Sequence, residues 1–173
     1  MLERSDRYDG PRQLMDKQEL ELRTKQFAVR VIKFVGGFNS SASGRVVGHQ
    51  LLKSGTSIGA NYREANRAVS RRDFVHKISI AEKEASETVY WLEICSETAL
   101  GKNDDCIQLE AEANELLAIF TSIGRSVRAN DRRVGESKSS QVSEEDHIDY
   151  GSKGFEEDID NLLPKTMRVE NGN

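Results

Sequence analysis

Proline, cysteine and tryptophan are scarce in this chain of 173 residues, which holds two prolines, two cysteines and one tryptophan. So few prolines argue against a multi-stranded β fold with many turns, and the abundant Leu, Ala, Glu, Lys and Arg in the middle of the chain favour helices. The cysteines, Cys95 and Cys106, lie in helical patterns on either side of a short turn. We interpret them as reduced core residues, because this arrangement argues against a disulfide framework or a thiolate metal site.

Long apolar runs are absent as well. None approaches the roughly 20 residues that a membrane-spanning helix needs, and residues 1–10 lack the apolar core of a secretory signal. We therefore expect a cytoplasmic protein without membrane contact. Hydrophobic residues make up 36% of the chain, which is low for a fully compacted fold, so part of the chain is expected to stay unpacked.

Charge is distributed unevenly along the chain. Residues 136–173 hold ten acids and four bases, a net charge of −6, whereas the preceding residues hold 19 acids and 21 bases, a net charge of +2. The sequence therefore predicts a slightly basic body that carries an acidic tail.

The strongest helical pattern begins near residue 71 and runs to about residue 100. Its apolar and small residues recur every three or four positions and so form one continuous seam. Because most of them are small, neighbouring helices can approach closely, and we expect this helix to pack on more than one side. The seam consists of Phe74, Ile78, Ala81, Ala85, Thr88, Leu92, Cys95 and Ala99.

Three further helices are predicted around this one. A capping box at Asp16 and Glu19 begins a helix that ends near Gly36, and a second helix follows the loop 39–44 and continues to about Ala65. The third helix has a capping signature of its own, Ser70 with Asp73, and a turn at residues 101–103 leads into a fourth helix that fades near Asn130. In the second helix, Gly55 and Gly59 indicate close helix contact rather than a phosphate loop, since the Walker lysine is absent.

The predicted fold is all-α: an antiparallel up-and-down four-helix bundle spanning residues 16–130. Residues 1–15 show no period and are expected to form a flexible arm, and residues 131–173 are expected to form a disordered acidic tail. Within this tail, Phe155, Ile159, Leu162 and Leu163 share one helical face. This segment is either a short helix that folds on a partner groove or a weakly amphipathic stretch of tail.

Candidate catalytic and metal-binding residues are few. A carboxylate-bridged metal pair needs glutamates from four helices and two Glu-x-x-His motifs. Asp73 and His76 give one Asp-x-x-His motif without a second copy, and His49 and His147 lie at unsuitable spacings. The sequence also lacks a Gly-x-Ser-x-Gly nucleophile elbow. We therefore predict that the protein is not an enzyme and that it has no catalytic residue, metal site or cofactor.

An arginine-rich elbow joins the second and third predicted helices. Arg63 and Arg67 lie one helical turn apart, and two guanidinium groups along one edge suit phosphate or carboxylate oxygens. The candidate nucleic-acid-binding cations are Arg63, Arg67, Arg71, Arg72 and Lys77. The alternative is an ion-pair network, for which the available acids are Glu64, Asp73, Glu84 and Glu87. The small positive charge of the body predicts only modest, salt-sensitive phosphate affinity.

The segments TSIGANYREA (56–65) and SRRDFVHKISIAEKEASETVYWLE (70–93) resemble the 23S rRNA intervening-sequence protein family. The resemblance covers about residues 20–128. It implies an antiparallel four-helix bundle that assembles as a homopentameric ring. The role of the family is mostly undefined, and the resemblance implies no enzymatic activity. A related branch, the accessory variability proteins of diversity-generating retroelements, is distantly similar. Those proteins are pentamers that bind a reverse transcriptase and nucleic acid through a basic surface.

Several recurring positions of this family are too polar for a core role alone. They could form hydrogen bonds across helices that fix the bundle register or a subunit contact. Tyr90 and Trp91 point in adjacent directions, so one can fill the core while the other anchors an interface. The candidate structural and assembly residues are Asn61, Tyr62, Glu64, Asp73, Phe74, Glu84, Glu87, Tyr90 and Trp91.

Two functions follow as hypotheses. The first is a non-catalytic, self-associating scaffold or accessory factor that forms a pentamer. The second is an accessory protein that binds RNA through the arginine-rich elbow, or that acts with a nucleic-acid-processing protein.

Overall fold

The computed structural model describes residues 16–139, and within that range the chain forms helices and no strand. This confirms the all-α prediction. The predicted arm 1–15 and residues 140–173, including the segment 155–163, lie outside the described residues. The four helices are α1 (Lys17–Gly36), α2 (Ala42–Ala65), α3 (Arg71–Glu97) and α4 (Asn103–Ser139).

Side-chain caps explain where the first three helices begin. The Asp16 carboxylate accepts a hydrogen bond from the backbone N–H of Glu19 at 2.7 Å, and the Ser70 hydroxyl accepts one from the N–H of Asp73 at 3.2 Å, as the sequence predicted. The start of α2 differs from the prediction. Ser41 caps it by accepting from the N–H of Gly44 at 3.0 Å, so the second half of the expected loop 39–44 is helical.

The ends of α3 and α4 also differ from the expected positions. Ala99 has a φ of 53°, in the left-handed region, so α3 ends at Glu97 and Ala99 is exposed rather than part of the seam. Helix α4 does not end near Asn130 but continues to Ser139. Gly135 has the lowest helix propensity of the residues in this extension, and its cost of about 1 kcal/mol relative to alanine is too small to stop a helix that contains no proline.

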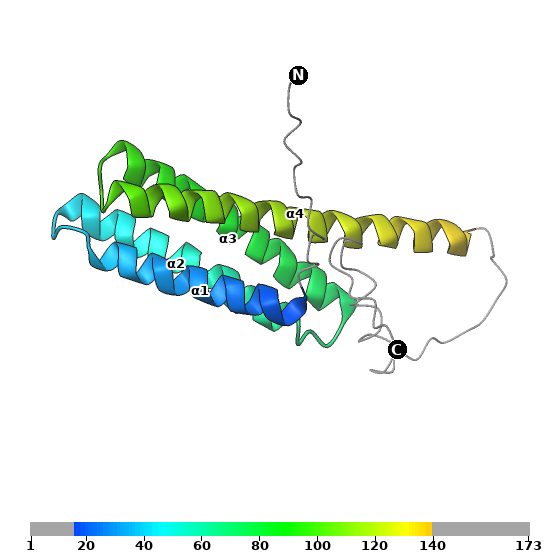
Figure 1. The fold of residues 1–173 in the computed structure, drawn as a ribbon. Coiled ribbons are helices and arrows are strands. Elements are labelled where there is room, and N and C mark those ends of the chain that lie inside the picture. Colours follow the sequence, from blue (N-terminus) through cyan, green and yellow to red (C-terminus); the bar gives the residue numbers. More distant parts are fainter. Residues whose placement is uncertain (1–15, 140–173) are drawn as a thin grey trace, which may run out of the picture.

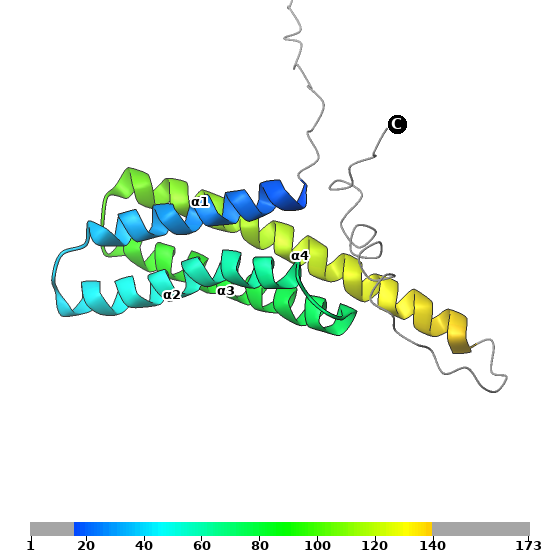
Figure 2. The same cartoon turned by 90° about the horizontal axis from the view of Figure 1, so that it is seen from below.

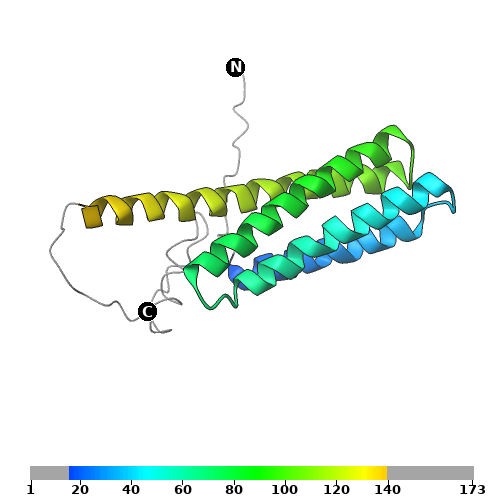
Figure 3. The ribbon, with the colours of Figure 1, turned by 180° about the vertical axis from the view of Figure 1, so that it is seen from behind.

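Consecutive helices pack against one another, and α1 makes a smaller contact with α4 (Figure 1). This order of contacts places α1 and α3 at opposite corners of the four-helix bundle. The α1–α2 and α3–α4 connections lie at one end, and the α2–α3 elbow lies at the other end (Figures 1 and 3). The last part of α4 projects beyond the other three helices (Figure 2). Among the described residues, no helix is both long and apolar enough to cross a membrane.

The core is built around α3, which packs on α2 along one side and on α4 along the other. Every seam residue from Phe74 to Cys95 is buried, which confirms the prediction of packing on more than one side. Large side chains from the other helices fill the space beside these small residues. They include Leu20, Phe27, Val31 and Phe34 of α1, Leu51, Ile58 and Tyr62 of α2, and Leu109, Leu116, Phe120 and Ile123 of α4.

Helix α2 approaches α1 through three glycines. A Cβ atom on Gly48 would lie 2.8 Å from Cγ1 of Val35, and one on Gly55 would lie 3.1 Å from both methyl groups of Val31. On Gly59 the same atom would lie 3.2 Å from Cβ of Thr24. The close-contact interpretation of Gly55 and Gly59 is therefore confirmed.

Gly48→Ala is expected to lower the free energy of unfolding by about 1–3 kcal/mol, because the stiff Val35 side chain must shift. Gly36 is the matched control, since a Cβ atom there meets nothing within 4 Å. Gly36→Ala should leave stability unchanged or raise it by up to about 1 kcal/mol. Urea unfolding followed by circular dichroism measures both, and equal midpoints for the two variants would contradict the close packing.

Candidate functional site

The α2–α3 elbow brings basic side chains together with an acid from α1. Nε of Arg63 lies 3.5 Å from Oε2 of Glu21, and Nη1 of Arg67 lies 3.7 Å from Oε1 of the same carboxylate. Asn66 also donates to Glu21, at 3.0 Å. Arg67 further donates to the backbone oxygen of Arg63 at 2.9 Å. One carboxylate therefore holds the end of α2 against α1.

The other elbow cations have different surroundings. Nζ of Lys77 lies 2.5 Å from Oε2 of Glu64, and this hydrogen bond raises the pKa of Lys77 above its usual value. Arg71 is half-buried and donates to the backbone oxygen of Val127 on α4 at 3.1 Å. Arg72 is exposed and has no ion pair within the part of the chain that the structure describes.

A surface groove lies between α2 and α3 at this elbow. Its lining alternates charges, since Arg63, Arg67 and Lys77 face it together with Glu64 and Asp73. Because both acids lie beside the cations, the groove is not a purely basic surface. It can accept phosphate or carboxylate oxygens only where a guanidinium group retains free N–H donors.

A second surface feature lies on the outer side of α3, near its C-terminal half. Tyr90 is 52% exposed and Trp91 is half-buried, and their rings meet edge-to-face with centroids 5.0 Å apart. The indole N–H of Trp91 donates to Glu87 at 3.3 Å. One turn earlier, Oε2 of Glu84 is buried without a hydrogen-bond partner among the described residues. This face therefore combines a partly exposed aromatic pair with one buried carboxylate oxygen that lacks a hydrogen-bond partner among the described residues.

Two of the five remaining predicted assembly residues are internal. Phe74 is buried, and so is Tyr62, whose ring meets that of Phe120 edge-to-face at 5.4 Å. Burial raises the pKa of Tyr62 to about 12. Asn61 is half-buried but donates within its own helix, to the backbone oxygen of Ser57 at 2.9 Å, rather than across to α3.

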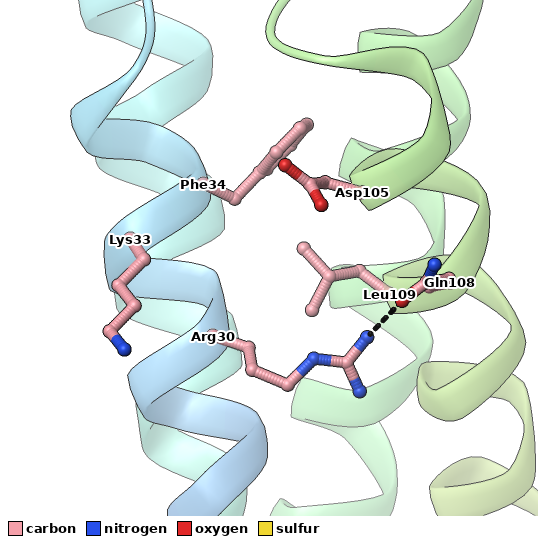
Figure 4. Close-up of a pocket in the computed structure, with 6 residues that line it drawn as sticks. All are labelled: Arg30, Lys33, Phe34, Asp105, Gln108 and Leu109. Carbon is pink, nitrogen blue, oxygen red and sulfur yellow. Dashed lines mark hydrogen bonds between the residues drawn. The ribbon is translucent and has the colours of Figure 1, made fainter.

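A third surface feature, a pocket lined by residues of α1 and α4, lies toward the opposite end of the bundle (Figure 4). Phe34 and Leu109 point into this pocket, and Arg30 reaches across to donate to Oε1 of Gln108 at 3.5 Å. Lys33 and Asp105 lie at its rim. The pocket is small and open, and within the described range no three His, Cys, Asp or Glu residues gather to form a metal site, here or elsewhere.

We compared the chain with known protein families and solved structures. The family model for the 23S rRNA-intervening sequence protein matches residues 17–122, which include α1, α2, α3 and the first part of α4. The chain belongs to this family. No curated protein matches it.

One solved structure is also similar to this chain. It is the crystal structure of a protein with unknown function from the S23 ribosomal protein family of Bacteroides thetaiotaomicron VPI-5482. Sequence identity is 37%, the TM-score is 0.56, and the match covers 61% of this chain and 97% of that chain. The likeness to accessory variability proteins stays a prediction.

Several charged residues that organise the bundle were missed by sequence reasoning. Glu21, rather than any of the four expected acids, pairs with Arg63 and Arg67. Arg23 bonds Glu112 at 2.6 Å and also contacts Glu115, which joins α1 to α4. These partners are far apart in the sequence, so no local spacing could have identified them.

The buried thiols and Tyr62 predict a loss of stability at alkaline pH. Burial raises the pKa of Cys95 to about 12 and also raises that of Cys106. In the unfolded chain a thiol loses its proton near pH 8.5. Between that pH and about 12 the unfolded state binds fewer protons than the folded state, so stability must fall as pH rises.

The free energy of unfolding is therefore expected to be constant from pH 7 to 8 and to decrease above about pH 9, by at most about 1.4 kcal/mol per pH unit for each group. Urea titrations at several pH values measure this. Cys95→Ala should make the decrease shallower, and a stability that does not change up to pH 10.5 would contradict the burial of these groups.

Proposed function

We propose that this protein is a non-catalytic scaffold or accessory factor that works by self-association in the cytoplasm. The observation that carries the proposal is the aromatic pair Tyr90 and Trp91 on the outer side of α3. Tyrosine and tryptophan are enriched where interfaces bury large areas, because each offers a rigid apolar body with a polar group at its edge. Tyr90 lies 52% exposed on this face and is available for such a contact.

The polar groups beside the pair support the same proposal. Glu87 is anchored by Trp91, and the Glu84 side chain has a buried oxygen that no described residue satisfies. An unsatisfied buried polar atom costs about 1–3 kcal/mol. A small rearrangement on association would allow a donor from a second copy to reach this carboxylate and remove that cost.

The assembly proposed is a homopentameric ring of antiparallel up-and-down bundles. The five-fold symmetry comes from the resemblance of residues 56–65 and 70–93 to the family, and membership in that family supports it. The alternating positions of the helix connections support the up-and-down order (Figure 1). Cyclic rings use one heterologous contact repeated around the axis, so the outer side of α3 must meet a different surface on its neighbour.

Tyr90→Ala is expected to reduce the pentamer to smaller species without unfolding the protomer, since this side chain is half-exposed. Trp91→Ala should have the same effect on assembly and also lower stability, because Trp91 packs against the core. Native mass spectrometry measures subunit number, and thermal unfolding measures stability. Val46→Ala is the control, because Val46 is 61% exposed and lies on α2 rather than on α3. Unchanged oligomers in both aromatic variants would exclude this interface.

A second candidate function is RNA binding through the arginine-rich elbow. It is favoured by the exposure of Arg63 and Arg67 beside one groove and of Arg72 elsewhere on the elbow, and a five-fold assembly would multiply this surface. The acid that competes with RNA phosphates is Glu21, which forms ion pairs with Arg63 and Arg67. Because the pairs are exposed, they are weak, and phosphate oxygens can compete for the same donors.

Replacing Arg63, Arg67, Arg71 and Arg72 with glutamine is expected to abolish salt-sensitive RNA retention without unfolding the bundle. Glu21→Gln should act in the opposite direction and strengthen retention, since it releases Arg63 and Arg67 at a stability cost of about 1 kcal/mol or less. Filter binding between 50 and about 200 mM salt measures both. Equal RNA retention by the wild-type protein and the variant with all four arginines replaced would reject the RNA function.

A further inference from the structure

The outer face of α1 carries large apolar side chains that none of α2, α3 and α4 covers. Leu22 is 53% exposed, Val29 is 43% exposed and Ile32 is 52% exposed. Their spacings of seven and three residues place them on one side of the helix, opposite the buried Phe27 and Val31. Three such residues in a row on one helix mark a surface that a partner could cover.

The same face is positively charged. From Leu22 to Gly36, α1 contains four basic residues and no acid. Arg23 is engaged by α4, but Lys25, Arg30 and Lys33 are exposed and have no ion pair within the described structure. Among the described residues, Arg30 donates to the neutral amide of Gln108 and to no acid, and the Lys33 side chain points away from Gln108 at the edge of the α1–α4 pocket (Figure 4). A partner with apolar and acidic side chains would fit this face.

One segment of the chain itself has this chemistry. Residues 155–163, FEEDIDNLL, contain four acids and no base. Helical spacing places Phe155, Ile159 and Leu162 on one face with the acids beside them. Such a segment can place its three apolar side chains against the three of α1, and its acids beside Lys25 and Lys33.

The chain is long enough for this contact to form within one molecule. Arg23 pairs with Glu112 and Glu115, so the start of the α1 face is level with residue 115 of α4. From there α4 runs about 36 Å to Ser139, at 1.5 Å per residue. Residues 140–154 span up to about 50 Å when extended, which is enough to return over that length. A helix over residues 155–163 would then cover about 13 Å of α1.

We propose that residues 155–163 of the same molecule dock as a short amphipathic helix on the outer face of α1, formed by Leu22, Lys25, Val29, Ile32 and Lys33. This contact does not depend on the proposed function, because α1 and α3 lie at opposite corners of the bundle. It also gives the acidic tail a binding surface other than the arginine-rich elbow.

Photocrosslinking of the full-length protein tests this. Benzoylphenylalanine is placed at Val29, and in a matched control at Val46, an exposed valine of α2. After irradiation and digestion, mass spectrometry is expected to find residues 155–163 attached to position 29 with several-fold higher yield than to position 46. Raising the salt concentration should lower the yield, because exposed charges are screened. Ile159→Asp with Leu162→Asp should reduce it to the control level.

Three outcomes would overturn the proposal. Equal yields from positions 29 and 46 would show that the tail has no preferred site. Attachment of position 29 to the folded helices of a second copy would assign the α1 face to self-association. Preferential capture of the segment from a crosslinker at Arg72 would place it on the elbow instead. A mixture of unlabelled and nitrogen-15-labelled protein tests whether the contact is intramolecular. Crosslinks between the two isotopic forms would contradict an intramolecular contact.

Discussion

Packing of α3 on two sides at once is the constraint on which the rest of the bundle depends. Small residues such as Ala81 and Ala85 are fully buried, and they let both α2 and α4 approach the same helix closely. A large side chain at either position would push one neighbour away and open the core. Glycines 48, 55 and 59 have the corresponding role between α2 and α1. The arrangement of the helices therefore depends on the positions of alanine and glycine, which allow close approach, as much as on the large side chains that fill the core.

This packing leaves the chemistry of the protein at its surface. The described cations and acids lie mainly at helix edges, where Glu21 joins α1 to the elbow and Arg23 joins α1 to α4. Such pairs are partly exposed and contribute little to stability each, but they fix how neighbouring helices meet. The aromatic pair on α3 and the apolar, basic face on α1 then remain as two separate surfaces. We propose that the first serves self-association and that the second binds the acidic segment of the chain.

Local patterns in the sequence predicted most of the fold. The caps at Asp16 and Ser70 and the seam of α3 follow from short-range spacing, and each is confirmed. The end of α4 was placed too early because composition changes near residue 131, but the extension contains no proline and its single glycine costs too little to stop the helix. The partners of Arg63 and Arg67 could not be predicted, since Glu21 is more than 40 residues away and only the packing of α1 on α2 brings it there. The assembly and binding roles of the candidate residues stay predictions.

Native mass spectrometry of the untagged full-length protein, purified at low salt, tests the central claim most directly. Self-association through the α3 face predicts a pentamer of the 19.4 kDa chain as the dominant species. A monomer as the only species at micromolar concentration would contradict the scaffold proposal, and it would remove the multiplied basic surface on which RNA binding depends.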